Sequence, residues 1–237
     1  MKVAVVGAGK MGREVEAVLR DRGHEPVLVS RGQPFPAGCA VGIDFTRPEA
    51  VVENLKKALS ARARYVIGTT GWNDRAEEVR RLVEESRGGL VHAANFSLGV
   101  NLFYRIVAEA ARVLAPFPDY DPWVLERHHR QKKDAPSGTA KTLAALVESA
   151  APGRKAATSL SGALGAGQFL VSAVRAGGIV GEHTVGFDAG GDEILLEHRA
   201  RTRRGFAQGA VLAAEWISTR DGVFGFDAVL ADLGARV

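Results

Sequence analysis

Three glycines near the start of the chain constrain its fold more than any other feature. Gly7, Gly9 and Gly12 form the pattern G-x-G-x-x-G between an apolar run at residues 2–6 and an amphipathic segment at residues 11–22. In a strand–turn–helix of this kind the first glycine allows a tight turn. The second lets a pyrophosphate approach the backbone, and the third lets helix and strand pack closely. The pattern therefore predicts a dinucleotide site at the helix start; a tight turn without a ligand is the alternative.

The rest of the N-terminal half alternates between strand-like and helix-like segments. We expect strands at residues 26–30, 41–45, 64–68 and 90–93, and helices at 48–59 and 74–86. Such alternation predicts an α/β domain of Rossmann type, with a parallel sheet covered on both faces. After Asn95 the rhythm changes. There we expect helices at 101–114, 139–150 and 207–218, and strands at 123–128, 169–174, 183–187 and 194–200.

The composition excludes several classes of protein. No apolar run approaches the roughly 18 residues that a transmembrane helix needs, and the N-terminus lacks the pattern of a signal peptide. The single cysteine, Cys39, excludes an intramolecular disulfide and fits a reducing compartment. A net charge of +4 without a basic run interleaved with aromatic residues suits small anionic ligands better than nucleic acid. We expect a cytoplasmic enzyme with neither a membrane nor a nucleic-acid partner.

The residues after the second expected strand bear on the choice of dinucleotide. An NAD site usually places Asp or Glu there to hold the ribose 2′-hydroxyl, but this chain has Ser30, Arg31 and Gly32. A hydroxyl and a guanidinium suit a 2′-phosphate, and Lys10 adds positive charge inside the glycine loop. We therefore expect NADPH as the preferred cofactor and NADH as the other candidate. Arg31 as an ordinary surface residue is the alternative.

The densest chemistry lies in residues 126–140, ERHHRQKKDAPSGTA. If a strand runs through His129, the alternation of its side chains makes His128 and His129 face opposite ways. One histidine can then reach a ligand while the other supports it. Lys132 follows in a loop, and the positive charge of the segment would attract a dianion. The segment thus offers a possible proton donor and a cation for a dianionic substrate.

The loop after Lys132 leads into the next helix. Residues 134–136 force a turn, and Ser137 or Thr139 can cap the helix that follows. A helix start preceded by Gly138 can hold a carboxylate. The alternative is a solvated polar edge with an exposed cationic loop. Two adjacent histidines lack the i, i+4 spacing of a helical zinc pair and have no cysteine to support them, so we expect no metal.

The string HHRQKKDAPSGTA resembles the signature of the dihydrodipicolinate reductase family, also called 4-hydroxy-tetrahydrodipicolinate reductases. The following segments are similar to that family in the same order: GKMG at 9–12, GTTG at 68–71, AANFSLGVN at 93–101, RAGGIVGEHTV at 175–185 and GFAQGAV at 205–211. The likeness spans nearly the whole chain. It implies a dinucleotide-binding domain at 1–97 with 204–237. It also implies an α+β domain at 98–203 with a mixed open sheet, which binds substrate and forms a homotetramer.

The motifs and the resemblance together imply a role for individual residues. His128 would be the catalytic proton donor or acceptor, and Lys132 a proton donor. The substrate-binding residues would be His129, Ser137, Gly138, Thr139 and, as a substrate-site or hinge contact, Arg203. The cofactor-binding residues would be Gly7, Ala8, Gly9, Lys10, Met11, Gly12, Ser30, Arg31, Gly68, Thr69, Thr70, Ala93, Ala94, Asn95 and Phe96.

The activity that the resemblance implies is NAD(P)H-dependent reduction of 4-hydroxy-tetrahydrodipicolinate to tetrahydrodipicolinate. Water is lost in this step, which lies on the diaminopimelate route to lysine. Two features depart from the family: the glycine loop is one residue shorter than in many members, and Ser30-Arg31 lacks their acidic residue. An aspartate dehydrogenase-like enzyme would share the glycine loop but not the histidine–lysine signature. A non-catalytic nucleotide-sensing Rossmann module would need no proton donors.

Overall fold

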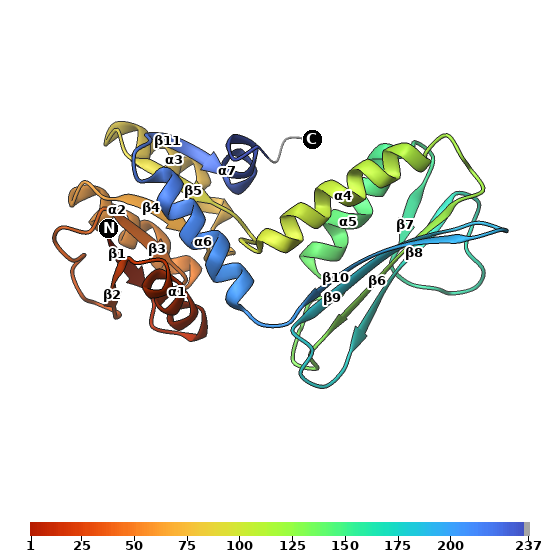
Figure 1. Ribbon diagram of the computed structural model, residues 1–237, viewed down its shortest axis with the longest axis horizontal. Coiled ribbons are helices and arrows are strands. Elements are labelled where there is room, and N and C mark those ends of the chain that lie inside the picture. The colour runs from red at the N-terminus through yellow and green to blue at the C-terminus, as the bar shows by residue number, and fades with distance from the viewer. Residues whose placement is uncertain (235–237) are drawn as a thin grey trace. The chain divides into compact units, whose positions relative to one another are not determined.

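The computed structural model of the chain describes residues 1–234 and divides into two compact units (Figure 1). The first unit comprises Met1–Leu98 and the segment from Arg203 onward, and the second comprises Gly99–Thr202. The junctions expected from the sequence, after residues 97 and 203, each differ from these by one residue. Within residues 1–234, no helix combines the length and apolar character needed to cross a membrane.

The first unit is built on a six-stranded sheet with the order β11-β5-β4-β3-β1-β2, and all neighbouring strands are parallel. The strands are β1 (Lys2–Val6), β2 (Glu25–Val29), β3 (Val41–Asp44), β4 (Arg64–Ile67), β5 (Gly89–His92) and β11 (Gly222–Gly225). The chain moves from β1 to one side for β2 and to the other for β3. The carboxyl ends of β1 and β3 therefore flank the switch point at which open α/β sheets bind ligands.

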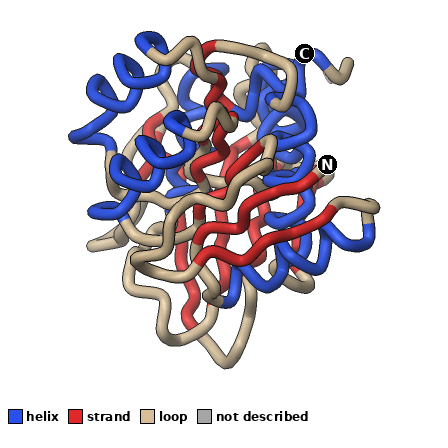
Figure 2. The backbone as a smooth tube through the Cα atoms, turned by 90° about the vertical axis from the view of Figure 1, so that its left-hand side faces the viewer, coloured by secondary structure: helices blue, strands red, loops and turns tan. Residues whose placement is uncertain are grey.

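Helices cover both faces of this sheet, and Figure 2 shows the strands between two groups of helices. The helices are α1 (Lys10–Asp21), α6 (Arg204–Ile217) and α7 (Phe226–Asp232) on one face, and α2 (Val51–Ser60) and α3 (Ala76–Glu85) on the other, with short 3₁₀ turns at Pro48–Ala50 and Asn73–Arg75. The alternation of β1 explains the two layers. Val3 and Val5 pack in the core with α1 and α6, whereas Ala4 and Val6 pack in the core with α2 and α3.

The second unit is a five-stranded mixed sheet with the order β10-β9-β6-β8-β7. Its strands are β6 (Asp121–His128), β7 (Lys155–Ala157), β8 (Gln168–Arg175), β9 (Gly181–Asp188) and β10 (Glu193–Ala200). β6 runs antiparallel to β9 and parallel to β8. Helices α4 (Leu98–Leu114) and α5 (Gly138–Ala150) contribute Phe103 and Leu143 to the same core as Phe169 and Val185 of the sheet, so they cover one of its faces.

The central strand β6 brings polar groups into this core. Alternate residues of the strand are buried, and these include Glu126 and His128. Glu126 pairs with His183 on β9, and His128 pairs with Arg175 on β8. The strand expected at 123–128 ends at His128 as predicted, so the condition that it runs on through His129 is not met. His129 leaves the ladder, because its backbone N–H donates to the carbonyl of Ile179 in a loop.

Candidate active site

A pocket of about 650 Å³ lies in the first unit at the carboxyl ends of β1, β2 and β3. Its volume is in the range of ordinary ligand sites. Of the residues predicted to bind cofactor, it is lined by Gly7, Ala8, Gly9, Ser30 and Arg31. Further lining residues that were not predicted follow β3 or lie on α2, namely Phe45, Thr46, Arg47, Glu49, Ala50, Glu53, Asn54 and Lys57. Once the order β2-β1-β3 is known, the residues after β3 are expected to face the same pocket.

The three glycines of the loop are required for different reasons. Gly7 has a φ of +103°, which side-chain-bearing residues rarely adopt. A Cβ on Gly12 would lie 1.8 Å from the carbonyl oxygen of Gly7, so only glycine fits where α1 crosses the loop. A Cβ on Gly9, the N-cap of α1, would meet no protein atom within 4 Å. Gly9 thus leaves open space beside the helix start, as a bound pyrophosphate would need.

Lys10 and Met11 are the first two residues of α1. The remaining predicted cofactor residues follow β4 and β5 at the same edge of the sheet. Residues 68–70 form the turn after β4, in which Thr69 is buried. Residues 93–96 follow β5, and the ring of Phe96 is buried in edge-to-face contact with Phe45 and Phe226. The side chain of Phe96 therefore belongs to the core, and its contact with the cofactor stays a prediction.

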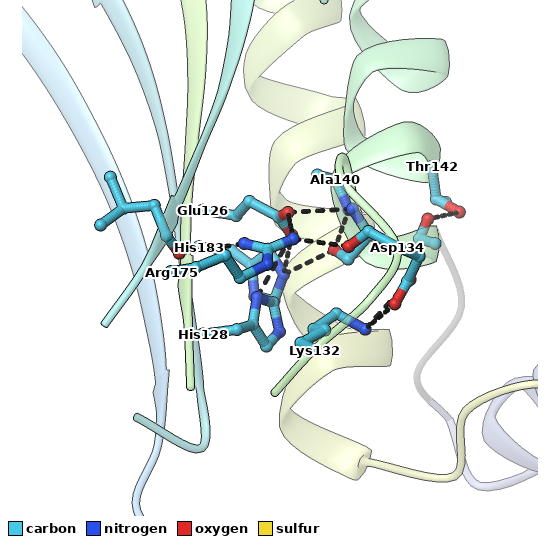
Figure 3. Close-up of polar contacts among 11 residues, drawn as sticks. Glu126, His128, Lys132, Asp134, Ala140, Thr142, Arg175 and His183 are labelled. Atoms are coloured by element: carbon cyan, nitrogen blue, oxygen red, sulfur yellow. Dashed lines mark hydrogen bonds and ion pairs between the residues drawn. The ribbon is translucent and has the colours of Figure 1, made fainter. Parts of the chain in front are cut away.

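Glu126 is the centre of the polar cluster in the second unit (Figure 3). Its side chain is fully buried. Oε1 accepts hydrogen bonds from Arg175 Nη2 at 2.7 Å and from the backbone N–H of Ser137 at 2.9 Å. Burial by itself would raise the pKa of this carboxyl, but interactions with His183, Ser137 and Arg175 outweigh it and hold the pKa well below its ordinary value. Glu126 is therefore an anion at neutral pH.

Two imidazole rings lie against the other carboxylate oxygen. Oε2 of Glu126 is 3.4 Å from His128 Nδ1 and 3.6 Å from His183 Nε2. The two rings meet edge to face, with centroids 5.1 Å apart. Burial lowers the pKa of His128 to about 4, and the attraction of Glu126 only partly opposes this. His128 is therefore a neutral imidazole at pH 7 in the protein without ligand.

The loop between β6 and α5 carries Lys132 and ends at the helix start. Lys132 Nζ donates to both carboxylate oxygens of Asp134, at 2.8 and 3.0 Å. Arg175 also donates to the carbonyl of Asp134 at 2.6 Å, which ties this loop to the cluster. Ser137 is the N-cap of α5, because its hydroxyl accepts from the backbone N–H of Ala140 at 3.2 Å. Of the two capping residues that the sequence left open, the structure selects Ser137.

The helix start is open to a ligand. Gly138, the first residue of α5, is exposed, and a Cβ there would meet no atom within 4 Å. The N–H groups of the first turn lack helical partners and bind anions readily. His129 is half-buried, and its Nδ1 is a buried nitrogen without a hydrogen-bond partner in residues 1–234. Arg203 is the N-cap of α6 in the first unit, so its contact with substrate stays a prediction.

One group of side chains in the described part of the chain could hold a metal ion, namely Glu126, His128 and His183. The sequence missed this grouping, because His183 comes from a different strand. Arg175 already neutralises the carboxylate through the 2.7 Å ion pair. A divalent cation there would sit beside a guanidinium, and this like charge disfavours metal binding at the cluster.

A parallel sheet that opens a pocket beside a glycine loop at its switch point is the architecture of a dinucleotide-binding protein. Family models agree over both units. The model described as "Dihydrodipicolinate reductase, N-terminus" matches residues 26–96, and "Dihydrodipicolinate reductase, C-terminus" matches residues 99–230. The chain therefore belongs to the dihydrodipicolinate reductase family, and it is an NAD(P)H-dependent oxidoreductase of lysine biosynthesis.

Relatives with this name cover the chain almost completely. The 4-hydroxy-tetrahydrodipicolinate reductase of Christiangramia forsetii is 34% identical over 98% of this chain and 99% of its own length. That of Neisseria gonorrhoeae is 36% identical over 97% of each chain. A solved dihydrodipicolinate reductase from Paenisporosarcina sp. TG-14, bound to dipicolinate, is 28% identical with a TM-score of 0.76, covering 97% of this chain and 99% of that one. This membership replaces the alternatives of an aspartate dehydrogenase-like enzyme and a sensing module.

Proposed function

We propose that the chain reduces 4-hydroxy-tetrahydrodipicolinate to tetrahydrodipicolinate, with the cofactor held by the first unit and the dicarboxylate by the second. The observation that carries this proposal is the helix start of α5 beside His128 and Lys132. There an open anion site, a neutral imidazole and an ammonium belong to one short stretch of chain. The overall reaction adds one hydride and one proton to the substrate and releases water.

Substrate binding is assigned to the residues around the helix start. The backbone N–H groups of Gly138 and Thr139 would hold one carboxylate, with Ser137 fixing the position of the helix through its bond to Glu126. His129, which directly follows β6 and is half-buried, would donate to the substrate through a ring nitrogen. Dipicolinate, the ligand of the Paenisporosarcina structure, is the matching probe for this site.

Proton transfer is assigned to Lys132 and His128. When bound, the reduced nicotinamide supplies the hydride. Lys132, whose Nζ forms an ion pair with Asp134, would stabilise the negative charge that develops on the substrate and donate the proton. His128 is neutral before substrate arrives, and a dianion beside it would favour its protonated form. It can therefore accept and return a proton during turnover.

NADPH is proposed as the preferred cofactor. Ser30 and Arg31 line the pocket where an NAD-specific protein would place a carboxylate.

Homotetramer formation and a cytoplasmic location also belong to the proposal. The face of the second sheet opposite α4 and α5 supports assembly, because Val174 and Leu195 leave 41% and 54% of their surface exposed there.

The test is to mix the protein, NADPH and substrate freshly made from aspartate semialdehyde and pyruvate by the upstream synthase, and to follow nicotinamide absorbance. We expect substrate-dependent oxidation. His128→Gln and Lys132→Ala should lower turnover by about 10² or more while NADPH binding is kept. Lys133→Ala, the neighbouring lysine, is the matched control and should turn over normally. No substrate-dependent oxidation in the unaltered protein would overturn the proposal.

A further inference from the structure

A second buried carboxylate, Asp44, lies at the switch point of the first unit. It is the last residue of β3, the strand beside β1, and it is fully buried. The next residues, Phe45 and Thr46, line the pocket at the carboxyl ends of the strands. Asp44 is absent from the motifs that identify the family and from the residues predicted to bind cofactor.

Five donors point at this carboxylate, and they divide between its two oxygens. Oδ1 accepts from the backbone N–H of Thr46 at 2.8 Å, from the Thr46 hydroxyl at 2.6 Å and from the Thr69 hydroxyl at 2.9 Å. Oδ2 accepts from Asn54 Nδ2 at 3.0 Å and from the Tyr65 hydroxyl at 2.9 Å. Oδ1 thus serves the two threonines, while Tyr65 on the Oδ2 side belongs to the core beneath the sheet.

All five donors are neutral, and no ion pair to Asp44 occurs in the described part of the chain. Burial, together with the nearby charge of Asp44, raises the pKa of Tyr65 well above its ordinary value, so its hydroxyl remains a donor. A buried carboxylate is costly unless hydrogen bonds satisfy it. An asparagine could not replace it, because its NH₂ would face donors and leave one side unmatched.

The two threonines connect the turns after β3 and β4. The backbone N–H of Thr46 also lies 2.8 Å from the hydroxyl oxygen of Thr69. The N–H of Gly68 donates to the backbone carbonyl of Asp44 at 2.9 Å, which fixes the start of the GTTG turn. We infer that Asp44 is a positioning residue for the dinucleotide site. Its Oδ1 accepts hydrogen bonds from both Thr46 and Thr69 and so fixes the positions of the two turns relative to each other at the pocket edge. This inference rests on the proposed cofactor site but not on the proposed reaction.

The experiment measures NADPH affinity of the full chain by nicotinamide fluorescence without substrate, well below the melting temperature of every variant. Thr69→Val removes an Oδ1 donor and Thr69→Ser restores it. We expect Thr69→Val to weaken NADPH binding about 10-fold and Thr69→Ser to stay within about twofold of the unaltered protein. Asp44→Asn should weaken it at least as much as Thr69→Val.

Tyr65→Phe is the matched control, because it removes one hydrogen bond from Oδ2 at an equally buried place. We expect it to lower thermal stability while NADPH affinity stays within about threefold. Equal loss of affinity in Tyr65→Phe and Thr69→Val would overturn the inference, as would normal affinity in Asp44→Asn. If Asp44→Asn does not fold, the comparison of Thr69→Val and Thr69→Ser with Tyr65→Phe still tests the inference. A protein that binds NADPH but reduces nothing would overturn the proposed reaction and leave this inference standing.

Discussion

The carboxylate of Glu126 and the guanidinium of Arg175 form a 2.7 Å ion pair in which the carboxylate is fully buried. The same carboxylate oxygen holds the N-cap residue of α5, Ser137, and the same guanidinium holds the loop that carries Lys132 through the carbonyl of Asp134. The start of α5 and the loop that carries Lys132 therefore both depend on this one ion pair.

Glu126→Gln should damage both stability and catalysis. The substitution leaves Arg175 without its anion, and breaking a buried pair costs about 3 kcal/mol. We expect a loss of that size in the free energy of unfolding in denaturant, and a turnover number lower by at least about 10-fold because the helix start and His128 lose their common support. Glu109→Gln, which breaks the exposed pair with Arg112, is the control and should change neither. Equal behaviour of the two variants would contradict this interpretation of Glu126.

Stability should fall between pH 7 and pH 5 partly because of His128. Burial lowers the pKa of His128 from 6.5 to about 4 in the folded protein. Between these values the unfolded chain binds the proton and the folded chain does not, so stability is fully present above pH 6.5 and is lost as pH falls. Between pH 7 and pH 5, we expect the free energy of unfolding to fall by roughly 1 kcal/mol less in His128→Gln than in the unaltered protein. Denaturant unfolding at both pH values measures this difference. His92 and His198, whose pKa values burial also lowers, keep part of the pH dependence in both proteins. If the free energy of unfolding depends on pH in the same way in both proteins, His128 does not contribute to the loss of stability.

Alanine substitutions at Gly9 and Gly12 should separate binding from folding. A Cβ on Gly12 would collide with the Gly7 carbonyl, whereas a Cβ on Gly9 would enter open space. We expect Gly12→Ala to yield destabilised or insoluble protein. Gly9→Ala should melt normally and bind NADPH at least about 10-fold more weakly, because the added methyl stands where a pyrophosphate approaches. Calorimetry of melting and of NADPH binding tests both predictions. Normal NADPH affinity in Gly9→Ala would show that the pyrophosphate does not bind beside Gly9.

Arg31→Ala should affect the two nicotinamide cofactors differently. If the guanidinium binds the 2′-phosphate, the variant loses a charge-assisted contact, and NADPH affinity should fall about 10-fold while NADH affinity stays unchanged. Arg81→Ala, on the exposed side of α3, is the control. Dissociation constants measured for both cofactors at one ionic strength give the answer. An equal change for NADPH and NADH would leave Arg31 as a surface residue.

The helices and most strands could be predicted because their patterns are local. The strand expected at 41–45 is β3, and the helix expected at 101–114 is α4 with three further residues at its start. β7, β11 and α7 were not among the elements expected from the sequence. β7 has only three residues, and β11 (Gly222–Gly225) is half glycine. Such short segments become strands through pairing with distant neighbours, and local propensity does not reveal that pairing.

The site was predictable only where it lies on one stretch of chain. His128, Lys132 and Ser137 occur together in the sequence, so their chemistry is visible there. Arg175 and His183 reach Glu126 only through the register of β8 and β9 against β6. A shift of one residue in that register would turn these side chains to the opposite face. The sequence of a strand does not contain its register, which is why these two contacts required the structure.

The interruption of the first unit by the second has a consequence for how the protein is made. Its β1 core face is completed by α6 and α7, which follow residue 202 and supply Ala210, Ile217 and Phe226 among others. On the same face, α1 is synthesised directly after β1, whereas α6 and α7 follow only after the whole second unit. At about 5–20 residues per second, this remaining cover for Val3 and Val5 is made on the order of ten seconds later. The strand that is synthesised first is therefore among the last to complete its packing, and until then part of its apolar face has no cover.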